Sequence, residues 1–269
     1  VVYRKKRKYD EALKYHFKAL NIREKVLGEE HLDTAISYNN IGYVYSEKDK
    51  YEEALEYYVK ALKIHIKKSG EEHPNTARFY NNIGVVYRKK RKYDEASTYL
   101  FKSLGIRETV LGKEHPDTAM SYNNIGTLHN RKGEYDKAFE YYHKALKIRK
   151  KVLGEEHPDT AMSYNNIGTI CSKKGKYNKA LKYHFKALNI REKILEKEHP
   201  NTAMSYNNIG FVYNKIGEYD KALENYFKAL EIYKKVLVEE HPDTKNTLYN
   251  IKFCQEAKAK KETEETQEQ

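Results

Sequence analysis

The chain has 269 residues, with 51 Lys or Arg against 39 Asp or Glu, and its formal net charge is +12. With 33% charged and 39% hydrophobic residues, the composition excludes a collagen and a wholly disordered chain. No stretch approaches the roughly 18 to 20 apolar residues that cross a bilayer, and no signal peptide opens the sequence. Two cysteines without a CxxC pair exclude a disulfide framework and predict a reduced, cytoplasmic compartment.

A repeat of 42 residues organises almost the whole chain. Its marker is a histidine that recurs without insertion or deletion, at His31, His73, His115, His157, His199 and His241. All five prolines directly follow these histidines, and twelve of the thirteen glycines fall in three fixed slots. One repeating unit therefore explains nearly every residue of the chain.

The first unit is expected to be incomplete. Residues 1–8 predict the second half of one helix, and residues 9–27 predict the helix that follows it. Residues 85–96 reproduce residues 1–12 without a difference, so the chain starts where a unit is already half complete. We therefore expect it to be a fragment of a longer array.

Each complete unit predicts two helices, which we call helix A and helix B. In the unit that starts at His157, Pro158 suits the first position of helix A. An apolar or small stripe of helical period follows, at Tyr164, Ile167, Gly168 and Cys171.

Helix B of that unit is predicted from about Tyr177 to Leu195. Its packing side carries Ala180, Leu181, Ala187, Leu188, Ile190 and Ile194. The glycines after helix B in earlier units are expected to be left-handed caps, at Gly28, Gly70, Gly112 and Gly154. Alternation of period two is almost absent. The predicted fold is all-α, a right-handed superhelical solenoid of antiparallel helix pairs.

The C-terminal part predicts a cap and a tail. Residues 242–258 form a last helix A, in which Lys252 and Gln255 replace the usual Gly and Tyr. The predicted solenoid thus spans residues 1–258, with a partial first repeat, five full repeats and this capping helix. Residues 259–269 have no apolar side chain beyond Ala259 and predict a charged, disordered tail. Its glutamates are expected to compete weakly for a basic groove.

One order of residues resembles the signature of the tetratricopeptide repeat. It is Tyr-x2-Ile-Gly-x2-Tyr followed by Ala-x3-aromatic, and it stands in the second unit as Tyr38, Ile41, Gly42, Tyr45, Ala54 and Tyr58. The segment ALKIRKKVLGEEHPDTAMSYNNIG is similar to the longer repeats of kinesin light chain. The resemblance covers residues 9 to about 251. It implies a scaffold or adaptor without enzyme activity, whose A helices line a concave groove for an extended peptide.

Pairs of asparagines follow the packed Tyr in each helix A and turn toward this predicted groove, since successive residues lie about 100° apart. A carboxamide has a donor and an acceptor, which match a peptide main chain. The resemblance implies that the second Asn of each pair clamps a peptide, at Asn40, Asn82, Asn124, Asn166 and Asn208. The alternative is an Asn ladder between neighbouring A helices. The two interpretations are compatible.

Basic residues on the same face predict a groove that favours acidic peptides. They are Arg78, Arg88, Lys89, Arg131, Lys173 and Lys215. The resemblance likewise implies acidic peptides with an aromatic anchor, and Tyr43 and Phe211 hold positions that could contact it. The alternative is that these charges are solvated helix ends.

Features that suggest catalysis or metal binding are better explained by packing. The six histidines lie one repeat apart, roughly 20 Å, which is too far to share a metal. We expect them to have a structural role between helices. Residues 168–177 fail as a phosphate loop because their spacer is too long, and Cys171 has no neighbouring base. We expect no enzyme activity, no metal and no cofactor.

Three functions are therefore predicted, in order of preference. The first is a scaffold that binds an acidic peptide or protein segment. The second is a spacer or an array that assembles head to tail, because the two ends have complementary shapes. The third is an RNA-binding solenoid, which we disfavour because the RKKRK runs at residues 4–8 and 88–92 occur in only two units.

Overall fold

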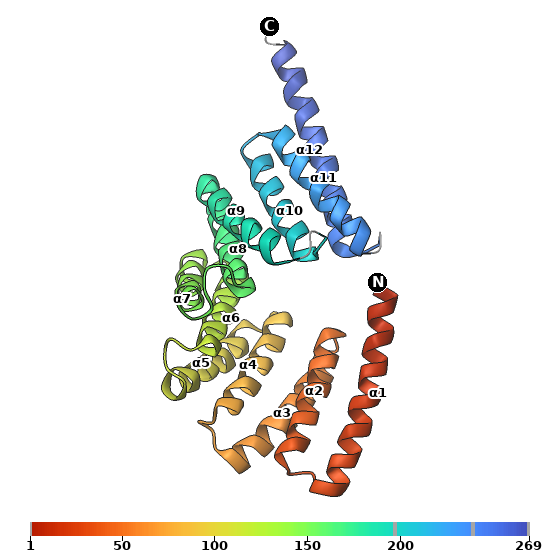
Figure 1. Cartoon of the computed structure of the whole chain (residues 1–269), viewed down its shortest axis with the longest axis vertical. Helices are drawn as coiled ribbons and strands as arrows, with labels where there is room; N and C mark the ends of the chain where they lie inside the picture. The colour runs from red at the N-terminus through yellow and green to blue at the C-terminus, as the bar shows by residue number, and fades with distance from the viewer. Residues whose placement is uncertain (1, 196–197, 238–239, 268–269) are drawn as a thin grey trace. The chain divides into compact units, whose positions relative to one another are not determined.

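The computed structural model describes residues 2–195, 198–237 and 240–267, with side chains from residue 8 onward. These residues form twelve α-helices and no strand (Figure 1). The B helices are α1 (Val2–Leu27), α3 (Tyr51–Ser69), α5 (Tyr93–Val110), α7 (Tyr135–Leu153), α9 (Tyr177–Ile194) and α11 (Tyr219–Val236). The A helices are α2 (Leu32–Glu47), α4 (Pro74–Lys89), α6 (Pro116–Lys132), α8 (Pro158–Lys173), α10 (Pro200–Lys215) and α12 (Pro242–Gln267). The prediction of an all-α solenoid of antiparallel helix pairs is confirmed.

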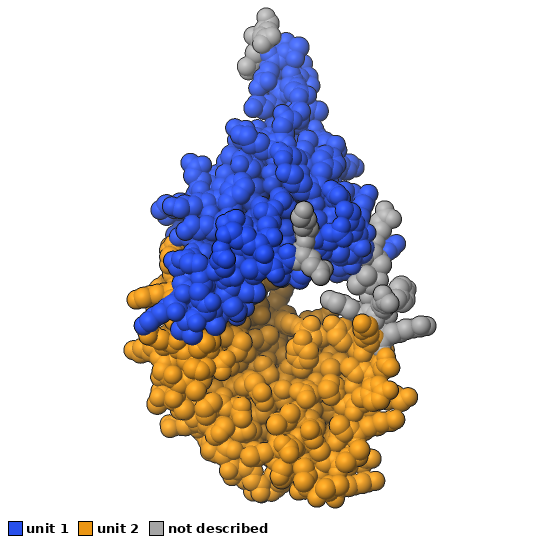
Figure 2. Space-filling model, viewed as in Figure 1, with its two compact units in different colours: residues 1–2, 149–269 blue, residues 3–148 orange. Residues whose placement is uncertain are grey.

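The helices are grouped in two compact units, one of residues 3–148 and one of residues 149–269 with residues 1–2 (Figure 2). The boundary between residues 148 and 149 falls within α7. In the first unit, α2 packs against α3 and α4 against α5, while α4 also contacts α2 and α6. In the second unit, α8 packs against α9 and α10 against α11, while α10 also contacts α8 and α12. Each unit is therefore a row of A helices with B helices packed against them.

The periodic histidines cap the A helices. Each lies just before its helix, and its Nδ1 accepts a hydrogen bond of 3.0–3.2 Å from the backbone N–H two residues later. Such a cap satisfies one of the free N–H groups at a helix start. The expected structural role of these residues is thus an N-cap.

The link from helix B to the next helix A needs glycine. Gly70 has φ 88° and ψ 165°, a region that is open essentially to glycine alone. Its positive φ agrees with the prediction, but its ψ lies outside the left-handed helical region that was expected. The Gly70 carbonyl accepts a hydrogen bond of 2.9 Å from Thr76 Oγ1, which fixes the link to the next helix.

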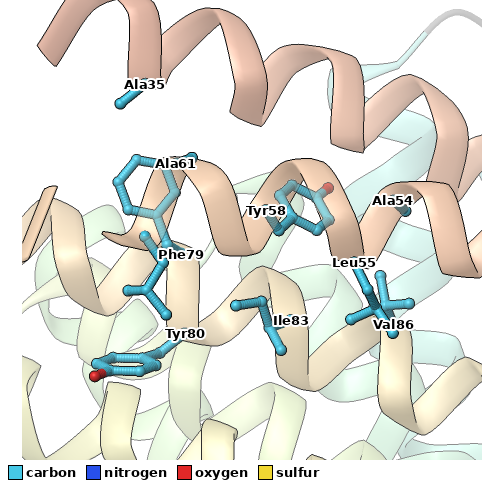
Figure 3. Packing of buried hydrophobic residues seen from close by; sticks show 10 residues of the cluster. Ala35, Ala54, Leu55, Tyr58, Ala61, Phe79, Tyr80, Ile83 and Val86 are labelled. Carbon is cyan, nitrogen blue, oxygen red and sulfur yellow. The ribbon is translucent and has the colours of Figure 1, made fainter. Parts of the chain in front are cut away.

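Helix A and helix B approach closely at a second set of glycines. An added Cβ at Gly126 would lie 2.8 Å from Cδ1 of Tyr142, closer than real Cβ contacts come. The same closeness recurs in the pairs Gly42 with Tyr58, Gly84 with Leu100, Gly168 with His184, and Gly210 with Tyr226. Figure 3 shows Tyr58 of α3 within the core that α3 shares with α4.

An arginine near the end of helix B ties four B helices to the following A helix. Its Nη1 donates a hydrogen bond of 2.6–2.8 Å to a serine hydroxyl, in the pairs Arg23–Ser37, Arg107–Ser121, Arg149–Ser163 and Arg191–Ser205. Burial lowers the pKa of Arg191 to about 10, so the group stays charged at neutral pH. Between α3 and α4 both members of the pair differ, since His65 replaces the arginine and Phe79 replaces the serine. Their ring centroids lie 5.2 Å apart.

The first helix differs from the prediction. Residues 85–96 leave α4 at Lys89, take a positive φ of 61° at Arg91 and enter α5 at Tyr93. The same sequence at residues 1–12 shows no such turn, because α1 is continuous from Val2 to Leu27. The expected half of a helix A is therefore an extension of helix B. Local sequence allows both conformations, and the turn forms where a whole helix A packs against helix B.

The last helix extends into the predicted tail. α12 continues to Gln267, and beyond Lys258 its charges pair four residues apart. The pairs are Lys258 with Glu262, Lys260 with Glu264, and Lys261 with Glu265, at 3.7–3.8 Å. Such exposed pairs contribute little each. Disorder of residues 259–269 in solution stays a prediction.

We predict that one substitution has opposite effects at two helical glycines. Gly126→Ala should destabilise the protein by about 1–3 kcal/mol, because the methyl group overlaps the Tyr142 ring. Gly105→Ala should stabilise it by about 0.5–1 kcal/mol, because nothing lies within 4 Å of an added Cβ there. Urea unfolding followed by circular dichroism measures both, and equal effects would contradict the assigned contact.

Candidate functional site

An Asn ladder connects neighbouring A helices. The second Asn of one helix donates from Nδ2 to Oδ1 of the first Asn of the preceding helix. The bonds join Asn82 to Asn39 at 2.9 Å, Asn124 to Asn81 at 2.7 Å, Asn208 to Asn165 at 2.9 Å, and Asn250 to Asn207 at 3.3 Å. The structure therefore contains the Asn ladder between neighbouring A helices that was predicted as the alternative to a peptide clamp.

The ladder leaves part of the second Asn accessible. Asn39 and Asn81 are 8% and 5% exposed, whereas the second members of the pairs are only half-buried, at Asn40, Asn82, Asn124, Asn166 and Asn208. Among the described residues, Oδ1 of Asn82 and of Asn124 accepts no hydrogen bond. The ladder orients these carboxamides and leaves an acceptor that a peptide N–H could reach.

In residues 3–148, basic side chains gather around one cavity. Tyr51, Arg88, Lys89, Arg91, Tyr93 and Arg131 line a volume of about 470 Å³. Lys89 is engaged, since its Nζ lies 3.2 Å from Glu47 Oε1 and donates to the Ser46 carbonyl at 3.1 Å. We call these six residues the basic cavity. It contains three of the predicted binding residues, Arg88, Lys89 and Arg131.

Arg88 has an uncommon environment in the basic cavity. Its Nε is buried and has no hydrogen-bond partner within the described ranges. Burial, and then the positive charge of Arg131, lower the pKa of the Arg88 guanidinium. The two arginines therefore lie close enough to repel each other, and no carboxylate of the described chain pairs with Arg88.

In residues 149–269, a second cavity of about 310 Å³ lies on the A helices. Its lining includes three predicted binding residues, Lys173, Asn208 and Phe211, together with Thr169, His184 and Asn250. Phe211 is 40% exposed. The lining thus combines carboxamides, one cation and an accessible aromatic ring.

The remaining predicted residues lie outside both cavities. Arg78 lies near the start of α4, over the Phe79 ring at 5.5 Å. Tyr43 is 56% exposed on α2. Lys215 lies over the Phe211 ring at 5.5 Å. Lys215 therefore contacts a lining residue of the second cavity, whereas Arg78 and Tyr43 line neither cavity. A role in binding stays a prediction for all three.

Sequence reasoning missed several cavity residues. Tyr51, Tyr93 and Arg91 line the basic cavity, although none of them is among the predicted binding residues. The available signal in the sequence was a departure from the repeat, since Arg91 stands where later units have glycine. In the structure this residue has a positive φ of 61°. His184 is a similar departure, because three of its five counterparts are tyrosines, at Tyr58, Tyr142 and Tyr226, while the other two are His16 and Leu100.

The structure also bears on metal binding, on thiol chemistry and on membrane insertion. Across the described ranges, no three His, Cys, Asp or Glu side chains gather as metal ligands. Cys171 and Cys254 are buried and free, and burial raises the pKa of both thiols. No helix in the described part of the chain is long and apolar enough to span a membrane.

His184 predicts a specific pH dependence of stability. Its side chain is 1% exposed, and burial, followed by Arg191, lowers its pKa from 6.5 to about 4. Between about pH 6.5 and pH 4, His184 is therefore protonated in the unfolded chain and neutral in the folded chain. The free energy of unfolding falls as the pH drops through this range. This contribution is about 2 kcal/mol between pH 7 and 4.5.

The control for His184 is His184→Tyr, which introduces the residue of three other units. We expect the variant to lose about 2 kcal/mol less stability than the parent between pH 7 and 4.5. Urea unfolding at the two pH values measures the difference. Equal losses in the two proteins would show that His184 does not cause the dependence.

The chain is similar in sequence and in structure to known repeat proteins. The sequence profile described as Tetratricopeptide repeat matches residues 1–67, 37–109, 75–142, 117–193, 170–235 and 201–266. No match is found among curated proteins. BtubC (BKLC) from P. vanneervenii superposes with a TM-score of 0.72 at 18% identity, over 87% of this chain and 94% of that chain. A protein described as a kinesin light chain with nearly identical TPR-like repeats, from Podosopora anserina, gives 0.64 at 22% identity, over 76% and 97%.

Proposed function

The chain belongs to the tetratricopeptide repeat family, and from that membership we propose that the face of its A helices binds an extended, acidic peptide segment of a partner protein. Repeats of this family form protein-interaction scaffolds in general, and the fold is typically without catalysis. The observation that carries the proposal is that the ladder orients the half-buried carboxamides of Asn82 and Asn124 on the same A helices as Lys89 and Arg131.

The two kinds of side chain have separate tasks in this proposal. Asn82 and Asn124 are held by the ladder, so they offer acceptors in fixed positions to peptide N–H groups whatever the peptide sequence. Arg131 and Lys173 are exposed and attract acidic side chains through the field of the surface. An aromatic side chain of the peptide would contact Phe211. The proposed partner is therefore acidic, with one aromatic residue.

A charge-reversal experiment tests the proposal. Peptides selected from a random library should bind the parent with a Kd of roughly 1 μM, about −8 kcal/mol, and more weakly as salt rises. Arg131→Glu with Lys173→Glu should weaken binding at least tenfold. Fluorescence anisotropy measures Kd, and circular dichroism checks that the helices persist.

The matched control reverses two charges on B helices. Lys63→Glu with Lys147→Glu changes the net charge equally, and both lysines are exposed. Glu231 holds the same repeat position, so the fold accepts the change. We expect Kd to change less than twofold. If both double variants weaken binding equally, general charge attraction explains it and the A-helix face is not the site.

Self-association is the second candidate, because both terminal helices expose apolar side chains. On α1, Tyr15 and Ile22 are 60% and 61% exposed, whereas their repeat counterparts are half-buried or buried. On α12, Tyr249 and Phe253 are 67% and 50% exposed and stack at 6.4 Å. We expect association that increases with concentration in sedimentation velocity and decreases in Tyr249→Asn. A parent that stays monomeric to millimolar concentration would exclude it.

Two further assignments stay predictions. A cytoplasmic location is supported by the two free cysteines, since secreted chains usually oxidise theirs. RNA binding is disfavoured, because the cations of the basic cavity lie in one place and do not form a track along successive units.

A further inference from the structure

The basic cavity has more charge than its position in the repeat requires. Among the A helices α2, α4, α6, α8 and α10, only α4 has Arg at this position, and the others hold Ser46, Asn130, Ser172 and Asn214. Its other counterpart, Arg4, lies in α1, where no helix A and no turn precede helix B within the described residues. All of these units form the same helix pair. The fold therefore needs a small polar side chain at this position, and Arg88 serves another purpose.

A second departure lies in the same cavity. Arg91 has φ 61°, a conformation that is unfavourable for a residue with a side chain and natural for the glycines at the same position in later units. Those glycines are Gly133, Gly175 and Gly217. Two arginines thus occupy unfavourable positions around one cavity, one by burial and one by backbone conformation.

The charge around Arg88 is not compensated. Arg131 lies close enough to lower the pKa of Arg88, and neither guanidinium has an ion pair within the described ranges. Two acidic groups that contact other residues of the cavity have their own partners there. Glu47 pairs with Lys89 at 3.2 Å, and Asp49 accepts a hydrogen bond of 2.6 Å from the Tyr51 hydroxyl.

We propose that the basic cavity binds a phosphomonoester group carried by the peptide partner, a phosphorylated Ser, Thr or Tyr. The inference rests on the proposed peptide-binding function and names a ligand for one part of that surface. A phosphomonoester carries about −1.5 to −2 charges on three acceptor oxygens. A carboxylate carries one charge on two oxygens, so it could neutralise only one of two neighbouring guanidiniums.

The other residues of the cavity fit the same ligand. Arg131 and Arg91 are exposed and line the cavity together with the less exposed Arg88, so all three guanidiniums could contact one phosphate. The Tyr93 hydroxyl has no partner in the described part of the chain and could donate a neutral hydrogen bond. The volume of about 470 Å³ exceeds a phosphate alone, which leaves room for the side chain that carries it.

Three degenerate peptide libraries test the proposal, with a fixed central phosphoserine, glutamate or serine in an otherwise identical acidic background. We expect the phosphoserine library to bind at least tenfold tighter than the glutamate library in fluorescence anisotropy at physiological salt. Equal binding of the phosphoserine and glutamate libraries would overturn the phosphate site and leave the proposed function intact. If none of the three binds, both proposals fail.

Two variants that each remove one positive charge test whether the basic cavity causes the preference for phosphoserine over glutamate. Arg88→Asn introduces the residue found at positions 130 and 214, so we expect the fold to persist. The measured quantity is the ratio of the affinities for the phosphoserine and glutamate libraries, and this ratio should fall from at least tenfold to below threefold. Lys63→Asn on α3 removes the same charge and introduces the residue of positions 21 and 189. It should keep the preference, and an unchanged preference in Arg88→Asn would overturn the assignment.

A phosphate of a nucleic acid is distinguished by competition. A single-stranded RNA 12-mer presents phosphodiesters with one charge each, whereas phenyl phosphate presents a monoester. We expect phenyl phosphate at millimolar concentration to displace the phosphoserine library from the parent, and the RNA at equal phosphate concentration to displace at least tenfold less. Stronger displacement by the RNA would contradict a phosphopeptide site.

Discussion

The close contact of helix A with helix B at one glycine is the constraint on which the rest depends. In five units a side chain of helix B lies so near the glycine of helix A that an added methyl group would overlap it. This closeness brings each pair together in one register, so the A helices follow one another in equivalent positions. Only then can an Asn of one A helix reach the Asn of its predecessor, 43 residues earlier. The ladder is thus a consequence of the A–B packing.

The near identity of the units separates residues that the fold needs from residues that it does not. A residue of the fold should recur, or change together with its partner. The buried Arg and Ser pairs show both behaviours, since four units keep them and a fifth replaces both by His65 and Phe79. Arg88 does neither. Among α2, α4, α6, α8 and α10 it appears once, and no carboxylate of the described residues pairs with it, which is why we assign it to a ligand.

The periodicity of the sequence was sufficient to predict the fold, because capping, packing and turn residues recur at the same positions. The candidate site was only partly predictable. Spacing alone shows that both Asn of a pair lie near one face, but not that the first is buried and the second accessible. Residues 1–12 and 85–96 show the same limit, since one sequence forms a continuous helix in one place and a turn in the other. In both cases the neighbouring helix decides, and neighbours are not visible in local sequence.

The solenoid also explains how one unit can hold an uncompensated charge. In repeat proteins, stability is approximately a sum of terms for single units and their nearest neighbours, so the cost of burying Arg88 is confined to its own unit and the two beside it. Those neighbours retain the glycine contact at Gly42 and Gly126 and the Asn bonds on both sides of α4. A globular enzyme would distribute such a cost over its single core. Here the unit that carries Arg88 is held by neighbours that have Ser46 and Asn130 at that position, and a binding residue can therefore evolve in one unit while the others keep the fold.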